Sequence, residues 1–593
     1  MKIRINNFIT WRKSFFVFGI FLIFTAIFLP VDYLVNNAIS PQIAQEIKNQ
    51  GIPGRMLALQ NQFRLGLLFL RIASVLLGGW LLVLARFWNY LKKWSFETLI
   101  KKRKADYFDS DSIDLRKEII FPGICFILVI IISVPILYKG FDHCELTNYL
   151  MLAKRGPLVS MACQNMESRA GHPGFTVVES IFVKILGGSE ATARLPALIF
   201  GAFVMFPVYF IARKYGPISF ANLVCLGLAA NGFYLFYNTY ARGYAFALAA
   251  YMFCVAIVLS IRLHPNWNKW VWLGVFTIIA CYSHQGSALY LSCLIFFLLI
   301  ERYKMGGMKF LVQPAITLGT VILILFFLYS VAIPSDLKYL KEFSVTNYYQ
   351  SYHINPRLLK VMVESWSWLR GMVFVGWIQF SLSTIGMVWL LRRRFWTTIY
   401  LVGPAVIGIT IIWSRELYVF TRYFLHFLPV YVLLSVFPLW RIPTNILKIN
   451  RRVAEISLGL LLVIFMTISL YRIYAMERCG VRAAVSDARK LMSANDRVMA
   501  ILDGYITVRY YYPEVVNGYR HTNFWKEINS EQPPEFIINV PYVEFDIPGG
   551  TTAILKKYNL VKKYPSWLDV DDDQDSIYLY KLKMKNEKQR INN

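Results

Sequence analysis

The apolar stretch IIFPGICFILVIIISVPILY, residues 119–138, decides the fold class of this chain. It contains no charged side chain, and as a helix it is long enough to cross a hydrocarbon core about 30 Å thick. Residues 308–332 and 456–474 form comparable runs. No ten-residue pattern of alternating polarity is visible, so helices rather than the strands of a barrel must satisfy the backbone of these segments.

The overall composition leads to the same conclusion. The 593 residues are 56% hydrophobic and only 17% charged, whereas a soluble domain has about 25% charged residues. We therefore expect a polytopic α-helical membrane protein with about thirteen transmembrane helices. The expected spans are residues 14–35, 66–87, 119–138, 190–212, 217–236, 240–261, 270–283, 286–301, 308–332, 370–391, 397–413, 419–440 and 454–474.

The basic residues indicate how the helices are oriented. The net charge of +28 could point to nucleic acid, but the lysines and arginines lie between apolar runs rather than on a polar domain, which argues against nucleic-acid binding. When these basic loops are placed in the cytoplasm, every loop alternates as the positive-inside rule requires. We expect a multi-pass protein of the plasma (inner) membrane, with a cytoplasmic N-terminus, an uncleaved first helix and an extracytoplasmic C-terminal domain.

Three regions follow along the chain. Residues 1–117 hold two membrane helices and a charged cytoplasmic stretch. Residues 118–475 hold the remaining helices and two long external loops, 139–189 and 334–369. Residues 476–593 are expected to form a small soluble α/β domain. Its candidate strands are residues 497–503, 535–540 and 577–582.

The loop 139–189 opens with two acidic residues, directly after a helix leaves the membrane. If this segment is helical, the i, i+3 spacing places Asp142 and Glu145 on one face. A carboxylate at the mouth of a membrane cavity can serve as a general base, since burial raises its pKa toward the working pH. The alternative interpretation is an ordinary charge at the membrane surface, exposed to water.

Further polar residues occur where other helices meet the external surface. His172 precedes Pro173, which fixes a turn before an amphipathic helix. Arg194 is interpreted either as a side chain that snorkels to the surface or as part of a site, and Arg242 either as a ligand contact or as a structural ion pair. Polar side chains at this depth are costly unless they face a cavity, so together they predict one outward-facing site. Its candidate members are His172, Arg194, Arg242, Tyr244, His284, Arg422 and Tyr423.

The order of these motifs resembles a family. An acidic first loop, His172-Pro173, the segment ARLPALIFG at 193–201, YARGY at 240–244, His284 and Arg422-Tyr423 follow one another as in the GT-C glycosyltransferases of the protein O-mannosyltransferase and aminoarabinose-transferase type. The resemblance covers roughly residues 118–440. It implies a GT-C-like core, a polyprenyl-phosphate sugar donor and an extracytoplasmic glycan, lipid or protein acceptor.

The resemblance also implies roles for individual residues. An acidic residue of the first core loop is the catalytic base, which is Asp142 here, with Glu145 as the competitor. Arg194, Arg242 or Arg422 would bind the phosphate of the donor, and the remaining candidates would contact substrate. Three departures are visible. The motif is Asp-His-Cys-Glu instead of adjacent acids, Gly174 replaces a frequent second proline, and two helices precede the core.

The expected topology favours a lipid-linked donor independently. Nucleotide sugars are made in the cytoplasm, and neither a Walker loop nor a Rossmann glycine motif is visible. An outward-facing transferase therefore requires a donor delivered through the bilayer. The carboxylate would deprotonate an acceptor hydroxyl that attacks the anomeric carbon with inversion, and an arginine would stabilise the leaving phosphate.

Cysteines and acidic runs do not point to a resident metal. No cysteine spacing is typical of a zinc site, while Cys144 and Cys163 lie in one external segment, so we hypothesise that they form a disulfide. The acidic run 569–575 begins like a calcium loop, but Gln574 stands in the required glycine position and Tyr580 in the bidentate glutamate position. No cofactor is implied, and a divalent metal is left open.

A transporter or lipid flippase is the competing interpretation, because such proteins also line cavities with arginines and carboxylates. Transporters often contain inverted repeats and helices broken near mid-membrane. Here no repeat is visible, and the polar residues gather at external helix ends, which favours a transferase. A non-catalytic envelope scaffold is the third interpretation.

Overall fold

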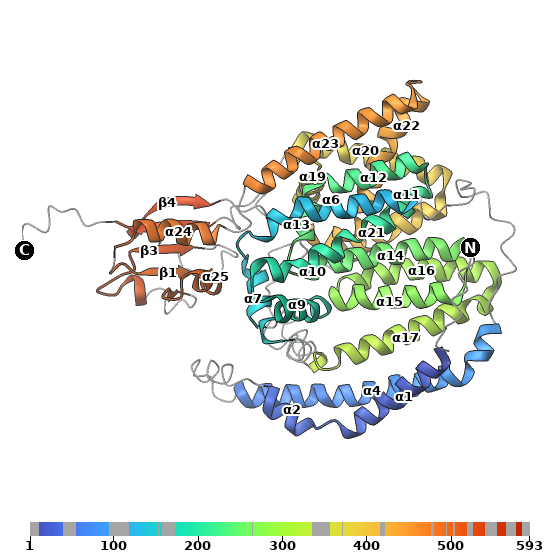
Figure 1. The fold of residues 1–593 in the computed structure, drawn as a ribbon, viewed down its shortest axis with the longest axis horizontal. Coiled ribbons are helices and arrows are strands. Elements are labelled where there is room, and N and C mark those ends of the chain that lie inside the picture. Colours follow the sequence, from blue (N-terminus) through green and yellow to red (C-terminus); the bar gives the residue numbers. More distant parts are fainter. Residues whose placement is uncertain are drawn as a thin grey trace, which may run out of the picture.

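A computed structural model describes residues 11–38, 55–93, 118–151, 153–156, 172–263, 265–334, 356–370, 372–414, 421–475, 480–493, 495–501, 504–518, 526–539, 554, 556–564 and 577–583. It consists of a large helical body and a small α/β unit built by the C-terminal part of the chain (Figure 1). The predicted pair Cys144–Cys163 and the acidic run 569–575 cannot be assessed, because the side chain of Cys144, residue 163 and the run lie outside the description.

The described helices follow the predicted membrane segments closely. The N-terminal helices are α1 (Trp11–Phe28), α2 (Val31–Ala38) and α4 (Arg55–Lys93). The helices of the body are α6 (Ile120–Leu137), α7 (His143–Met151), α9 (Pro173–Leu186), α10 (Glu190–Ala202), α11 (Met205–Arg213), α12 (Ile218–Ala229), α13 (Gly232–Asn238), α14 (Tyr244–Leu263), α15 (Trp267–Ser283), α16 (Ser287–Gly306), α17 (Val312–Tyr329), α19 (Pro356–Trp366), α20 (Val373–Arg393), α21 (Phe395–Ser414), α22 (Leu428–Asn445) and α23 (Arg451–Ala475). Short 3₁₀ helices are η3 (Ala153–Arg155), η4 (Gly307–Leu311) and η6 (Thr421–Phe427).

All thirteen predicted segments contain helix, but not all of them qualify as membrane spans. Within the described residues, eight helices are long and apolar enough to cross a membrane, and the bent pair α12–α13 would make nine. The remaining predicted segments are helical but shorter or more polar. The protein is therefore a polytopic helical membrane protein, as expected, whereas the count of thirteen spans is not confirmed.

The N-terminal helices α1, α2 and α4 pack beside the body rather than inside it (Figure 1). Helices α1 and α4 cross at Gly19 and Gly78, where a Cβ added to Gly19 would lie 2.8 Å from the carbonyl oxygen of Gly78. Small residues permit such close approach of membrane helices. Helix α4 in turn contacts α17, where Trp80 Nε1 donates a hydrogen bond to Thr320 Oγ1 at 2.8 Å.

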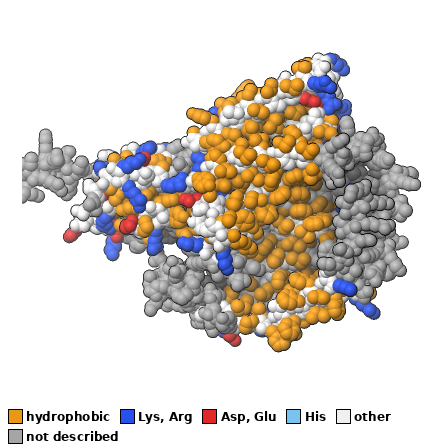
Figure 2. Space-filling view, viewed as in Figure 1, with side chains coloured by type: hydrophobic (Ala, Val, Ile, Leu, Met, Phe, Trp, Pro, Cys, Tyr) orange, Lys and Arg blue, Asp and Glu red, His pale blue; other side chains and the backbone are white. Residues whose placement is uncertain are grey.

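The helical body has buried polar groups at both of its ends. Helix α14 runs from Tyr244 to Leu263, 20 residues, which corresponds to about 30 Å. Near its last turn Arg262 pairs with Glu301 of α16 at 2.8 Å, with both side chains at most 4% exposed. The candidate site residue Tyr244 begins the same helix. Ion pairs therefore fix one end of the body, and the candidate site lies at the other end, with a mostly apolar side surface between them (Figure 2).

The span formed by α12 and α13 is broken by an angle of 68°. Asn231 satisfies the backbone at the break, because its Oδ1 accepts from the backbone N of Tyr234 at 3.0 Å and its Nδ2 donates to the carbonyl of Trp366 at 2.8 Å. An asparagine in this position caps the new helix. The bend directs α13 and the following residues 239–243 into the end of the body that holds the candidate site.

The C-terminal unit is a mixed five-stranded sheet in the order β2-β1-β3-β5-β4. Its strands are β1 (Val498–Ile501), β2 (Val516–Gly518), β3 (Phe536–Asn539), β4 (Tyr558–Tyr564) and β5 (Ile577–Leu582). Strand β1 is parallel to β2 and β3, whereas β5 is antiparallel to β3 and β4. Helices α24 (Val481–Leu491) and α25 (Gly504–Tyr511) accompany the sheet. The three predicted strands coincide with β1, β3 and β5, so the expected α/β character is confirmed.

Candidate active site

Asp142 and Glu145 form a reciprocal cap at the start of α7. Oδ1 of Asp142 accepts a hydrogen bond from the backbone N of Glu145 at 2.7 Å, and Oε2 of Glu145 accepts from the backbone N of Asp142 at 3.3 Å. This is the capping-box arrangement, in which the residue before a helix and the third helical residue satisfy each other's backbone. The i, i+3 spacing therefore brings the two carboxylates together, as predicted, through the cap.

Glu145 is fully buried and extensively bonded. Its Oε1 accepts from Arg194 Nε at 2.9 Å and from the backbone N of Ala241 at 2.8 Å, and its Oε2 pairs with Arg194 Nη2. Together with the bond from the backbone of Asp142, these contacts occupy both oxygens. A carboxylate held in this way is poorly placed to accept a proton from a substrate, which favours a structural role for Glu145.

Arg194 lies behind Glu145 and has no exposed surface. Its Nη1 donates to the carbonyl of Leu137 at 2.9 Å, and its Nη2 donates to the carbonyl of Gly140 at 3.0 Å. A further carbonyl, that of Lys139, accepts from Nη1 as well. The guanidinium thus ties the end of α6 to α10. This geometry favours fixation of the acidic loop over binding of a donor phosphate.

Asp142 has the more favourable position of the two carboxylates. Its side chain is 7% exposed, whereas that of Glu145 is 0% exposed. Asp142 is also linked to the segment 240–244 through Glu145. A carboxylate oxygen of Glu145 accepts a hydrogen bond from the backbone N of Ala241, the residue before Arg242. The loop that carries Asp142 and the segment YARGY at 240–244 therefore belong to the same site.

His172 is held in a defined orientation at the start of α9. Its Nδ1 lies 2.8 Å from the carbonyl oxygen of Ser283, and since a carbonyl can only accept, Nδ1 carries the proton and Nε2 is left as an acceptor. Burial, the charge of Arg242 and the neighbouring His284 hold the pKa of His172 well below its usual range. The ring is therefore a neutral hydrogen-bonding group.

Four rings from four segments form a cluster around His172 and His284. The ring centroids of His172 and Tyr244 lie 4.9 Å apart, and those of His172 and His284 lie 5.4 Å apart in a stacked arrangement. His284 also lies 5.1 Å from Tyr244 and 5.7 Å from Tyr423. The structure therefore brings together the predicted residues of the loop after position 171, of α14, of the α15–α16 junction and of η6.

Gly243 permits this close approach. A Cβ added there would lie 2.0 Å from the carbonyl oxygen of Ser283 and 3.0 Å from Cβ of His172. A side chain would push α14 away from the α15–α16 junction. Gly174 is similarly restricted, since its Cβ would lie 2.9 Å from the ring of Tyr282. This contact gives a physical reason for glycine at the position where the resemblance leads one to expect a second proline.

Two arginines flank the ring cluster. Arg242 is 5% exposed and sits in a tight turn in which its backbone N donates to the carbonyl of Tyr240 at 2.6 Å. Arg422 is half-buried, and the positive charges of both arginines contribute to the lowered pKa of His172. Arg242 and Arg422 therefore provide positive charge beside the ring of His172.

Glu179 of α9 is a site residue that the sequence interpretation missed. It is 0% exposed, and its Oε2 accepts from Asn148 Nδ2 at 2.7 Å, while Asn148 Oδ1 accepts from Thr176 Oγ1 at 3.0 Å. Burial, and then the negative charge of Glu145, raise the pKa of Glu179 well above its usual range. Glu179 lies on the buried face of α9, which it shares with Thr176 and Ser180. The available signal was a single acidic residue in a largely apolar helix.

Tyr511 of the C-terminal unit was also missed. Its hydroxyl accepts from the backbone N of Phe141 at 2.8 Å and donates to Oε1 of Glu190 at 3.2 Å. The ring of neighbouring Tyr510 lies 5.9 Å from that of Phe141. Helix α25 therefore contacts the loop that carries Asp142. No local sequence pattern could reveal this contact, because it joins segments 370 residues apart.

Metal binding has no support within the described part of the chain. No group of three or more His, Cys, Asp or Glu residues there is placed to hold a metal ion.

Comparisons with known proteins give structural likenesses only. No family model matches the sequence, and no curated protein matches it. The chain is similar to the structure of ArnT from Cupriavidus metallidurans bound to undecaprenyl phosphate, with 12% identity, a TM-score of 0.48, and coverage of 79% of this chain and 98% of that chain.

Two other solved structures show weaker similarity. The oligosaccharyltransferase AglB from Archaeoglobus fulgidus, in complex with an inhibitory peptide and a dolichol-phosphate, has 12% identity, a TM-score of 0.41 and coverage of 77% of this chain and 74% of that chain. Arabinosyltransferase EmbB from Mycobacterium smegmatis has 14% identity, a TM-score of 0.39 and coverage of 62% and 34%. At such identities and TM-scores they assign no residue of this chain.

Proposed function

We propose that the protein is a membrane glycosyltransferase that transfers a sugar from a polyprenyl-phosphate-linked donor to an extracytoplasmic acceptor. The observation that carries this proposal is the convergence of three kinds of group at one end of the helical body. Asp142 supplies a carboxylate that is buried to 7% exposure, Arg242 and Arg422 supply positive charge, and His172 and Tyr244 supply hydrogen-bonding rings. In such a transfer a carboxylate can deprotonate the acceptor and positive charge can stabilise the leaving phosphate.

Asp142 acts as the general base in the proposed reaction. It removes the proton from an acceptor hydroxyl as the oxygen attacks the anomeric carbon, and the bond from that carbon to the phosphate oxygen breaks with inversion. Glu145 and Arg194 fix the loop, so that Asp142 keeps its position. Asp142 is chosen over Glu145 because Arg194 and the backbone of Ala241 and Asp142 already bond both carboxylate oxygens of Glu145.

Arg242 and Arg422 bind the phosphate of the donor. Charge-assisted hydrogen bonds from a guanidinium stabilise the negative charge that develops on the leaving phosphate, so no separate general acid is required. His172 offers Nε2 as an acceptor, and Tyr244, His284 and Tyr423 provide ring surfaces for the sugar or the acceptor.

A transporter is the second candidate, but the distribution of charge favours a transferase. The polar cluster lies at one end of the body, whereas at the other end Arg262 and Glu301 form a buried pair to which Tyr400 also donates a hydrogen bond at 2.6 Å. Groups that bind in turn from both sides are expected near the middle of a transporter. The proposal also includes the membrane topology, in which the N-terminus is cytoplasmic and residues 476–593 are extracytoplasmic.

The test is transfer by the purified protein in nanodiscs. Synthetic polyprenyl-phosphate sugars serve as donors, and mass spectrometry detects loss of sugar from the lipid and its appearance on added membrane lipids, glycans or proteins. Lipid extracts of a deletion strain and of the wild type narrow the choice of acceptor. Movement of intact donor across liposomes without any cleavage would support the transporter and contradict the transferase.

A further inference from the structure

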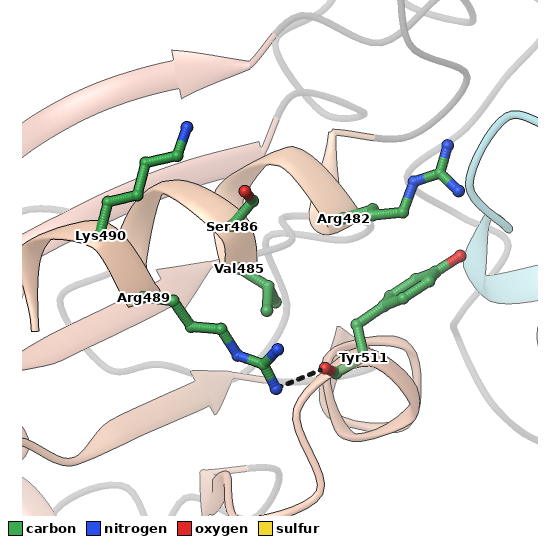
Figure 3. A pocket seen from close by; sticks show the side chains of 6 residues that line it. All are labelled: Arg482, Val485, Ser486, Arg489, Lys490 and Tyr511. Atoms are coloured by element: carbon green, nitrogen blue, oxygen red, sulfur yellow. Dashed lines mark hydrogen bonds between the residues drawn. The ribbon is translucent and has the colours of Figure 1, made fainter.

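The C-terminal unit contains a pocket of about 390 Å³ between α24 and α25 (Figure 3). It is lined by Arg482, Arg489, Lys490, Ser486, Val485 and Tyr511. Three of the six lining residues are basic and none is acidic. The pocket is therefore suited to a negatively charged group.

Arg489 is the residue that gives the pocket its excess charge. Its Nη2 donates to the backbone carbonyl of Tyr511 at 3.2 Å (dashed in Figure 3), and its guanidinium lies 5.3 Å from the ring of Tyr512. Among the described residues no carboxylate pairs with it. Arg482 and Lys490, in contrast, face Glu190 at 3.8 Å and Asp487 at 3.3 Å.

The pocket is close to both the membrane and the candidate active site. Helix α23 ends at Ala475 and α24 begins at Val481, so the pocket follows a membrane span within a few residues. Arg482 Nη2 donates to the carbonyl of Tyr138, just after α6, at 2.9 Å. Tyr511, which lines the pocket, bonds the backbone of Phe141 next to Asp142.

We propose that this pocket binds a phosphate group of the acceptor and holds it beside the loop of Asp142. A guanidinium matches the geometry of phosphate oxygens and is weakly hydrated, so Arg489 and Arg482 suit this ligand better than lysine would. Ser486 adds a hydroxyl donor. That the phosphate belongs to the acceptor rests on the proposed function, whereas phosphate binding in the pocket does not.

The experiment measures phosphate binding without any sugar donor. Full-length protein in phosphatidylcholine nanodiscs is titrated with inorganic phosphate, and binding is followed by thermophoresis. Arg489→Gln should weaken binding about tenfold or more, the usual effect of losing a hydrogen bond to a charged group. Arg509→Gln is the matched control, since Arg509 is exposed on α25 and does not line the pocket.

A second arm identifies the source of the phosphate. If a lipid headgroup occupies the pocket, nanodiscs that contain phosphatidylglycerol should weaken binding of inorganic phosphate to the wild type but not to Arg489→Gln. If the natural ligand is soluble, both lipid compositions should give the same affinity for the wild type. Thermal melting shows that each variant is folded.

Equal phosphate affinity of the wild type, Arg489→Gln and Arg482→Gln would overturn the proposal. Such a result leaves the transferase standing if transfer still depends on Asp142. Conversely, loss of phosphate binding in Arg489→Gln supports the pocket even if no sugar transfer is ever detected, in which case only the proposed function fails.

Discussion

The hydroxyl of Tyr511 accepts a hydrogen bond of 2.8 Å from the backbone N of Phe141, the residue immediately before Asp142. The same hydroxyl donates to Glu190 at the start of α10. Burial raises the pKa of Tyr511, so the hydroxyl keeps its proton and can make both bonds. A single tyrosine of the C-terminal unit thus joins two membrane-proximal segments at the proposed base.

Tyr511→Phe should lower kcat several-fold, since the hydrogen bond that positions the loop is worth about 1 kcal/mol. The KM for the lipid donor should stay near the wild-type value, because Arg242 and Arg422 are untouched. Tyr505→Phe, on the same helix, is the control. Steady-state transfer kinetics in nanodiscs test whether kcat falls while KM stays constant. An unchanged kcat would show that the position of the loop does not depend on Tyr511.

Asp142→Asn should reduce transfer by about 10²–10⁴, the usual contribution of a positioned general base. Asparagine caps helices as well as aspartate does, so α7 should remain intact and the melting temperature should change little. Single-turnover rates with a synthetic donor provide the measurement. Full turnover in a folded Asp142→Asn protein would show that Asp142 is not the general base, and would favour the transporter.

Glu145→Gln should affect folding more than chemistry. The substitution leaves Arg194 buried without its countercharge, and breaking one side of a buried pair costs about 3–5 kcal/mol. Arg194→Gln in the same protein should recover part of this loss, because the unpaired charge is then removed. Thermal unfolding of the single and double variants tests this, and strictly additive losses would argue against the pair.

Arg242→Gln should raise the KM for the donor about tenfold or more, since one charge-assisted bond to phosphate is lost. The affinity for a donor analogue without phosphate should not change, which separates phosphate binding from general damage to the site. Arg509→Gln again serves as the control. An unchanged KM would indicate that Arg422, and not Arg242, binds the phosphate of the donor.

Glu179→Gln should flatten the pH dependence of stability. Burial raises the pKa of Glu179, so the folded protein holds this proton more tightly than the unfolded chain, whose glutamate pKa is about 4.3. The resulting stabilisation is complete below that value and is lost as the pH rises through the folded-state pKa. Melting temperatures from about pH 5 to about pH 9 should fall more steeply for the wild type. Parallel curves would mean that Glu179 is not protonated in the folded state.

Much of the fold was predictable because membrane helices are encoded locally. Runs such as 119–138 have to be helical in a bilayer, and Figure 2 shows the apolar surface that results. Strand β4 was not predicted, because five consecutive residues between Tyr558 and Tyr564 are exposed and the chain shows no alternation there. The number of full spans was also not predictable, since helix length within the bundle depends on neighbouring helices.

Most residues of the candidate site were named from the sequence, with Glu179 and Tyr511 as exceptions, but their individual roles could not be distinguished. The cost of polar groups at membrane depth pointed to His172, Arg242 and His284, which the structure brings together. Nothing in the sequence distinguishes Arg194 from Arg242, because the carbonyls that surround Arg194 become its partners only when α6 and α10 pack. The raised pKa of Glu179 likewise arises from burial by other segments.

The break between α12 and α13 has a consequence for how a lipid-linked donor reaches the candidate site. The chain bends by 68° between α12 and α13, and Tyr237 and Arg242, which follow the bend, are only 2% and 5% exposed. A polyprenyl donor would then keep its isoprene units among the lipid tails while its phosphate reaches the arginine. The donor would therefore not have to leave the bilayer for its phosphate to reach the site.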